Sequence, residues 1–186
     1  MVPEGDPLVN DAEAALRLKA LVCDAHREAC YNNNNLSSDI IKRIALTKVP
    51  FQQALIGAIA SGGERHGPTR QCRLLIYGGG PEAALELLER GEKVPGFGNS
   101  FFREDIDAAW FKVRDFVKAE MPEDWERLDR IHQAVLTVKP IHPNAASFTA
   151  ICAHKLGLPV GAELALAIEA RVMVLAIQWA EVYHNA

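Results

Sequence analysis

The sequence predicts an all-α protein. Hydrophobic residues recur at spacings of three and four along most of the chain, and glycines and prolines fall between these periodic segments. Strand-like runs are few, and the best of them, LLIY at residues 74–77, is short. With 186 residues, of which 49% are hydrophobic, the chain can bury a core without disulfide bonds.

Three helices are expected in the first third of the chain. The first covers residues 11–31 and ends at the four asparagines of residues 32–35, because asparagine favours turns over helix interiors. A short helix follows over residues 37–46, with the N-cap residue types Ser, Ser and Asp at its start. The segment PFQQALIGAIASGG, residues 50–63, has a proline in the first turn and two glycines at the end, as a helix prefers.

The middle of the chain reads as two helices and a loop. Residues 69–77 are expected to be helical and to stop at the three glycines of residues 78–80. Pro81 then opens the helix PEAALELLERG. The segment KVPGFG, residues 93–98, is a loop because it contains one proline and two glycines.

Four further helices are expected in the last part of the chain. Two amphipathic helices over residues 105–120 and 123–138 meet around a proline, and a third covers residues 144–156. The last, over residues 161–183, is too apolar for a surface helix, so it belongs to a core or to an interface between subunits.

Composition excludes several classes of protein. The net charge is −4, which disfavours a general nucleic-acid-binding surface. No apolar run reaches the roughly 18 residues of a membrane span, and the acidic N-terminus lacks the features of a secretory signal. The four cysteines form no CxxC pair, so no metal site is indicated. We therefore expect a cytoplasmic protein with reduced cysteines.

Two histidines lie in segments that could carry chemistry. His66 lies in the turn GERHGP, where one ring nitrogen could bind a backbone carbonyl and the other could face a cleft. The alternative is a histidine that caps a helix end. His26 lies on a polar stretch of the first helix, two residues after Asp24, and residues two apart do not share a helix face.

The segment KVPGFGNSFFR, residues 93–103, is a candidate binding loop. Gly96 and Gly98 would let a flat or anionic ligand approach the backbone closely. Lys93 and Arg103 could hold a phosphate group. The alternative is an ordinary connection between two helices.

Two later features have structural alternatives. The segment KPIHPNAAS offers Asn144 or Ser147 as a helix cap. Arg171 interrupts the apolar stripe of the last helix, where a buried arginine needs a carboxylate or another acceptor. It could bind a substrate or form a structural ion pair.

In this order, the segments resemble the citrate synthase family over about residues 12–184. GERHGPTRQC is similar to the family's GPLHG-type segment, which implies a catalytic role for His66. KVPGFGNSFFR is similar to the VPGYGH loop, and KPIHPNAASFTAICAHKLGLP to the YPNVD segment and its following helix. AIEARVMVLAIQWAEV resembles the late helix with a substrate-binding arginine, which implies Arg171. VCDAHREACYNN resembles the ADHE-type helix end, which implies His26 as a second substrate-binding residue.

The resemblance implies an all-α, multi-helical fold with a large domain, a small domain and a cleft between them. Residues 1–66 and 151–186 would form a partial large domain that carries the dimer helices, and residues 67–150 an inserted small domain. A homodimer is therefore expected. Family members are considerably longer at the N-terminus, so we expect either a naturally short form or a fragment.

The family joins an acyl-CoA to a 2-oxo acid, or cleaves citryl-CoA in the related lyase reaction. His66 would donate a hydrogen bond to the forming enol oxygen. The position of the family's second histidine reads Asn99, and that of its carboxylate base reads Ala146. Asparagine can donate a hydrogen bond but cannot transfer a proton, and alanine cannot act as a base, so we expect catalysis to be impaired or lost.

The resemblance also implies the ligands. A CoA thioester would bind as a substrate, together with a small carboxylic acid, and no tightly bound cofactor or metal is expected. The residues placed at the CoA site are Lys93, Val94, Gly96, Gly98, Ser100, Arg103 and Lys139.

Two hypotheses follow. The protein could be an enzyme that acts on a CoA thioester with another base, Asp105 or Asp107. Alternatively, it could be a non-catalytic module that binds CoA or a carboxylate, or that takes part in an assembly.

Overall fold

The structure is a computed structural model that describes residues 12–31, 36–61, 68–98 and 108–186, and the side chains of residues 12, 25–31, 108, 109, 111 and 112 fall outside this description. The all-α fold class is confirmed, because the described residues form helices and a single isolated bridge between Phe97 and Pro143. The helices are α1 (Ala12–Tyr31), α2 (Leu36–Leu46), α3 (Phe51–Ala60), α4 (Thr69–Leu74), the π-helical turn η2 (Leu75–Gly79), α5 (Gly80–Glu89), α6 (Ala108–Glu120), α7 (Pro122–Leu136), α8 (Ala145–Lys155) and α9 (Glu163–Asn185).

Two local predictions about the helix ends are wrong. The helix of residues 69–77 does not stop at the three glycines, because the chain continues through Gly78 and Gly79 as a π-helical turn and enters α5 at Gly80. Ser37, Ser38 and Asp39 do not cap α2, because all three lie inside the helix, which already includes Leu36. The predicted cap at Asn144 is confirmed, since its side chain accepts a hydrogen bond from the amide of Ala146 at the start of α8.

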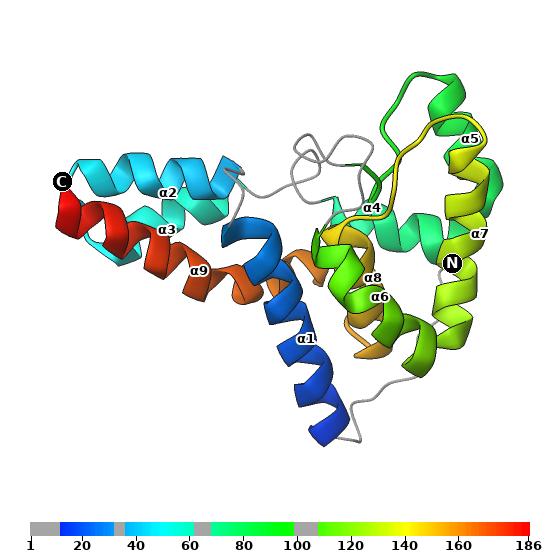
Figure 1. Ribbon diagram of the computed structural model, residues 1–186, viewed down its shortest axis with the longest axis horizontal. Helices are drawn as coiled ribbons and strands as arrows, with labels where there is room; N and C mark the ends of the chain where they lie inside the picture. Colours follow the sequence, from blue (N-terminus) through cyan, green and yellow to red (C-terminus); the bar gives the residue numbers. More distant parts are fainter. Residues whose placement is uncertain (1–11, 32–35, 62–67, 99–107) are drawn as a thin grey trace.

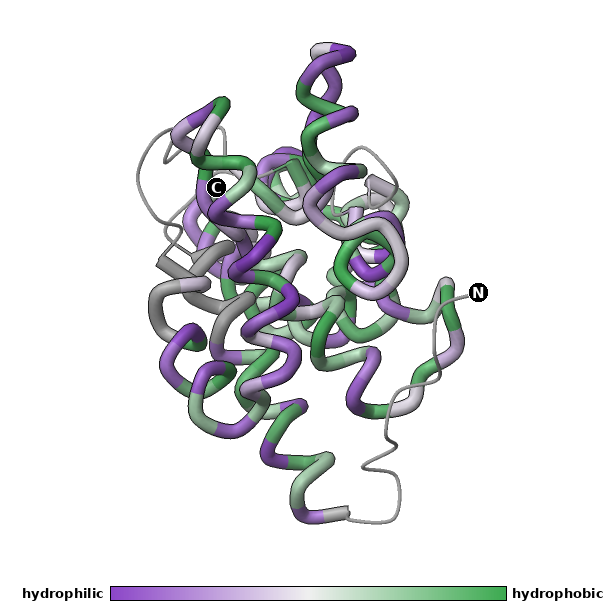
Figure 2. Tube along the Cα trace, turned by 90° about the vertical axis from the view of Figure 1, so that its right-hand side faces the viewer, coloured by the Kyte–Doolittle hydropathy of each residue, from purple (hydrophilic) through white to green (hydrophobic). Residues whose placement is uncertain are grey.

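Helix α8 is the centre of the larger part of the molecule, which we call the body. All of its residues from Ala145 to His154 are buried. Helices α1, α4, α6 and α9 contact α8, and α7 contacts both α5 and α6 (Figure 1). Hydrophobic and hydrophilic residues alternate along these helices (Figure 2), the pattern of amphipathic helices that each contribute one face to a common core.

Helices α2, α3 and the second half of α9 form a separate projection, which we call the arm (Figure 1). Its core is small and consists of Ile41, Ala54, Ala58 and Leu175. The indole nitrogen of Trp179 donates a hydrogen bond of 3.0 Å to the carbonyl of Val49, which fixes the turn before α3 against α9. Helix α9 therefore joins the two parts, because its first half packs into the core of the body.

The division into a large and a small domain stays a prediction. Its second boundary, between residues 150 and 151, falls inside α8. Among the described helices, none combines the length and the apolar character that a bilayer crossing requires.

Candidate functional site

Two loops at one end of the body are joined by backbone hydrogen bonds. We call residues 93–98, which follow α5, and residues 139–144, which precede α8, the paired loops. The amide of Gly98 donates to the carbonyl of His142, and the amide of Asn144 donates to the carbonyl of Gly96, both at 2.8 Å. The bridge between Phe97 and Pro143 lies between these two bonds. The two segments that sequence analysis selected for a CoA site are thus in direct contact.

Glycine is required at two positions of the first loop. Gly96 has a φ of 81° and Gly98 a φ of 72°, in the left-handed region that other residues rarely adopt. A Cβ atom on Gly96 would also lie 2.2 Å from the sulfur of Cys72 and 2.6 Å from the hydroxyl of Ser147. Close contact with α4 and α8 therefore explains why residue 96 must be a glycine, whereas at residue 98 only the backbone angle requires one.

Polar side chains of the α8 N-terminus hold the glycine loop in place. The amide group of Asn144 donates to the carbonyl of Gly98 at 2.7 Å, while its oxygen caps α8. The hydroxyl of Ser147 donates to the carbonyl of Gly96, also at 2.7 Å. Sequence analysis proposed Asn144 and Ser147 only as caps and missed that both bind the other loop.

The first turn of α8 contains no acidic residue. Ala146, at the position that the resemblance assigns to the family's base, is buried there and offers only a methyl group. Lys93 and Lys139 begin the two paired loops with exposed side chains, and Val94 is buried in the core. These two lysines are the described cations of the predicted CoA site.

A pair of histidines joins α7 to the paired loops. Nε2 of His132 and Nδ1 of His142 are 3.0 Å apart, so one ring donates a hydrogen bond to the other. Burial, together with the neighbouring His142, holds the pKa of His132 below its usual value. Sequence analysis missed this pair, because the two rings meet only when α7 packs against the loop, and the spacing of the two histidines in the sequence does not indicate such a contact.

Arg171 lies away from the paired loops and lines a small cavity. It is half-buried on α9, beside a cavity of about 20 Å³ that Ser37 of α2 and Ser61 at the end of α3 also line. Ser61 immediately precedes the segment that contains His66 in the sequence.

The remaining predicted site residues stay predictions. His26 lies on α1, but its side chain is outside the described residues. The others fall wholly outside the described segments and are His66, Asn99, Ser100, Arg103, Asp105 and Asp107.

A buried ionic network, which sequence analysis missed, connects α9 to the body. Arg73 of α4 forms an ion pair of 2.9 Å with Glu163, the first residue of α9, and both side chains are buried. Arg73 also lies 3.4 Å from Nδ1 of His154, whose ring stacks on that of Tyr77. The hydroxyl of Tyr77 donates to Asp124 at 2.6 Å. The network links five elements, which are α4, η2, α7, α8 and α9.

Solved structures with the same fold are known, although no family model and no curated protein sequence matches the chain. A citryl-CoA lyase from Hydrogenobacter thermophilus superposes on 89% of this chain and 70% of its own, with a TM-score of 0.72 and 16% sequence identity. The citrate synthase from Thermotoga maritima MSB8 superposes on 84% of this chain, with a TM-score of 0.72 and 20% identity. The matched part is 47% of that citrate synthase, so the chain spans about half of its length. The chain therefore has the citrate synthase-like fold that the order of its sequence motifs implied.

Proposed function

We propose that the protein binds a CoA thioester at the paired loops and that its capacity for citrate synthase-like condensation or cleavage is impaired or lost. The observation that carries this proposal is Ala146 in the first turn of α8, next to the paired loops. The resemblance places a carboxylate base at this position, and the chain has a methyl group there. The choice of a CoA thioester as the ligand rests on analogy with the structures of the same fold, one of which is a citryl-CoA lyase.

The polar groups beside Ala146 cannot replace the missing base. The side chain of Asn144 uses its oxygen on the amide of Ala146 and its nitrogen on the carbonyl of Gly98. The hydroxyl of Ser147 is bound to the carbonyl of Gly96. Neither group is a carboxylate, and removal of a weakly acidic α-proton needs a base of suitable pKa in contact with it.

Binding of CoA is supported by the arrangement of cations around loops that are already in place. Lys93 and Lys139 are exposed at the starts of the two paired loops, where they can meet phosphate groups without the desolvation cost of a buried charge. The loops are held by the hydrogen bonds described above, so little ordering would be required on binding.

Calorimetry tests the binding. We expect CoA to bind the protein and the double variant Lys93→Ala with Arg103→Ala to lose about 1.5 to 3 kcal/mol of binding free energy, as charged hydrogen bonds are lost. The matched control, Lys42→Ala with Arg43→Ala on α2, removes the same charge from the arm and should bind CoA normally. Unchanged affinity in the loop variant would remove CoA from the paired loops.

Release of free thiol from acetyl-CoA in the presence of oxaloacetate tests the loss of catalysis. We expect no release by the unmodified protein, because a general base typically contributes about 100- to 10,000-fold. Ala146→Asp or Asn99→His alone should rescue little, since groups that act as a unit are not additive; the double variant should rescue more. Strong oxaloacetate-dependent release that His66→Ala abolishes would instead support an active enzyme with Asp105 or Asp107 as its base.

A further inference from the structure

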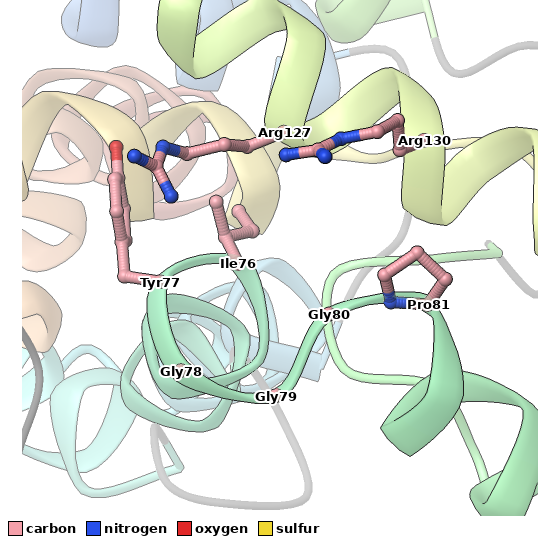
Figure 3. Close-up of a pocket in the computed structure, with 8 residues that line it drawn as sticks. All are labelled: Ile76, Tyr77, Gly78, Gly79, Gly80, Pro81, Arg127 and Arg130. Carbon is pink, nitrogen blue, oxygen red and sulfur yellow. The ribbon is translucent and has the colours of Figure 1, made fainter.

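A second hollow lies at the other end of α5 from the paired loops. It has a volume of about 190 Å³ and lies between the bend at residues 78–81 and α7 (Figure 3). Two arginines of α7, Arg127 and Arg130, line it together with Tyr77. Helix α5 has 10 residues, so a length of about 15 Å separates this hollow from the glycine loop.

The two arginines are directed at the hollow rather than at acidic partners on their own helix. Each has a glutamate four residues earlier, Glu123 and Glu126, in the order that favours ion pairs along a helix. Nevertheless, within the described residues neither guanidinium group has a carboxylate within ion-pair distance. Figure 3 shows both side chains extended beside the bend, with the guanidinium of Arg127 toward the hydroxyl end of Tyr77.

The two buried carboxylates of the network described above already have partners. Asp124 accepts a hydrogen bond from the hydroxyl of Tyr77 and forms an ion pair of 3.0 Å with Lys155. Glu163 is paired with Arg73. Neither of these two buried carboxylates is left to pair with Arg127 or Arg130.

The glycines make the hollow accessible. Gly80 has a φ of 70°, and a Cβ atom on Gly79 would lie 2.9 Å from that of Ala83, so neither position accepts a larger residue easily. Gly78 is exposed and adds no side chain. A π-helical turn of this kind is rare and is frequent at functional sites.

The positive end of α5 is not the source of the attraction. Pro81 has no amide hydrogen, and the amide of Gly80 donates to the carbonyl of Leu75. A carboxylate oxygen of Glu82 lies 3.4 Å from where a Cβ atom of Gly80 would be, so it already occupies the neighbourhood of the helix end. A ligand must therefore be held by the two guanidinium groups.

We propose that this hollow binds a phosphate group, either as the free ion or as part of a small phosphate ester. Two guanidinium groups three residues apart can each donate two parallel hydrogen bonds to phosphate oxygens, and their summed charge matches a dianion. The volume of about 190 Å³ suits a phosphate group with a few attached atoms. The site is independent of the proposed CoA site.

A calorimetric titration with inorganic phosphate at constant ionic strength tests the proposal. We expect saturable binding at millimolar concentration, and a Kd at least about tenfold higher in Arg127→Ala with Arg130→Ala, from loss of charge-assisted hydrogen bonds. Arg127→Lys with Arg130→Lys keeps the charge but loses the paired donors, so its Kd should also rise; this variant serves if the alanine variant does not fold. Arg43→Ala with Arg90→Ala is the charge-matched control and should leave the Kd unchanged.

Two further measurements separate this site from its alternatives. Glu82→Gln removes a repelling carboxylate and should lower the Kd for phosphate about 2- to 5-fold. A small phosphate ester that binds more tightly than inorganic phosphate would identify the ester as the ligand, and equal affinity would identify the free ion. CoA affinity should be the same in all the arginine variants, so failure of either site is visible without the other. No binding of phosphate by the unmodified protein, or an unchanged Kd in both arginine variants, would overturn the proposal.

Discussion

The body and the arm bury their apolar residues to different degrees. In the body, ten consecutive residues of α8 are buried and the surrounding helices contribute to one large core. In the arm, the core comprises only four buried residues. Large apolar side chains are exposed in the arm and at the middle of α9, among them Ile56 at 69%, Leu46 at 60% and Met173 at 71%. The two regions thus differ in the size of their cores, and the arm exposes apolar side chains that a partner could cover.

The largest expected effect concerns this apolar surface. We predict that a second copy of the chain covers the arm, since an interface would remove its exposed apolar side chains from water. Light scattering at micromolar concentration should give the mass of a dimer. Ile56→Asp with Met173→Asp should give a monomer, because it would bury two unpaired charges in the interface, at a cost of more than about 3 kcal/mol.

Leu16 provides the control for the dimer prediction. It is exposed on α1, outside the arm, and Leu16→Asp should leave the dimer intact. A monomeric unmodified protein would contradict the prediction, as would a dimer that survives the double change in the arm.

The second prediction compares aromatic residues of the two regions. Phe148 is fully buried in α8, so Phe148→Ala should lower the free energy of unfolding by about 3 to 5 kcal/mol through the cavity that it leaves. Phe51 in the arm is only half-buried, 5.7 Å from Trp179 between ring centroids, and Phe51→Ala should cost clearly less. Urea unfolding measures both, and equal losses would show that the arm is packed as tightly as the body.

The sequence predicts the parts of this molecule that local rules determine. The helix segments follow from hydrophobic periodicity, and the cap at Asn144 follows from its residue type. The continuation of the chain through Gly78 and Gly79 could not be predicted, since glycine pairs usually end helices and here α5 and η2 pack against α7. The same holds for the ion pair of Arg73 and Glu163, whose members are 90 positions apart.

The candidate site divides in the same way. Its two segments were identified by their resemblance to a family, and the structure adds the contacts between them. Sequence reasoning interpreted Gly96 as a place for a ligand, while the atoms that approach it are those of Cys72 and Ser147. The hollow beside Arg127 and Arg130 was missed, because three glycines in a row were read only as a helix stop.

The smallest expected effect is a pH dependence of the body that the arm does not share. The pKa of His132 is lowered, first by burial and then by His142, so the folded protein resists protonation of this ring more than the unfolded chain does. Above the ordinary value of 6.5 the ring is neutral in both states, and its contribution to stability is complete. As the pH falls below that value, the unfolded chain gains a proton first, and stability decreases until the folded protein is also protonated. Urea unfolding between about pH 7 and about pH 5 should therefore show a falling free energy of unfolding, with a smaller slope in His132→Gln.

His184→Gln, at the exposed end of the arm, should keep the slope of the unmodified protein. An identical slope in all three proteins would mean that the histidine pair does not link α7 to the paired loops in a pH-dependent way.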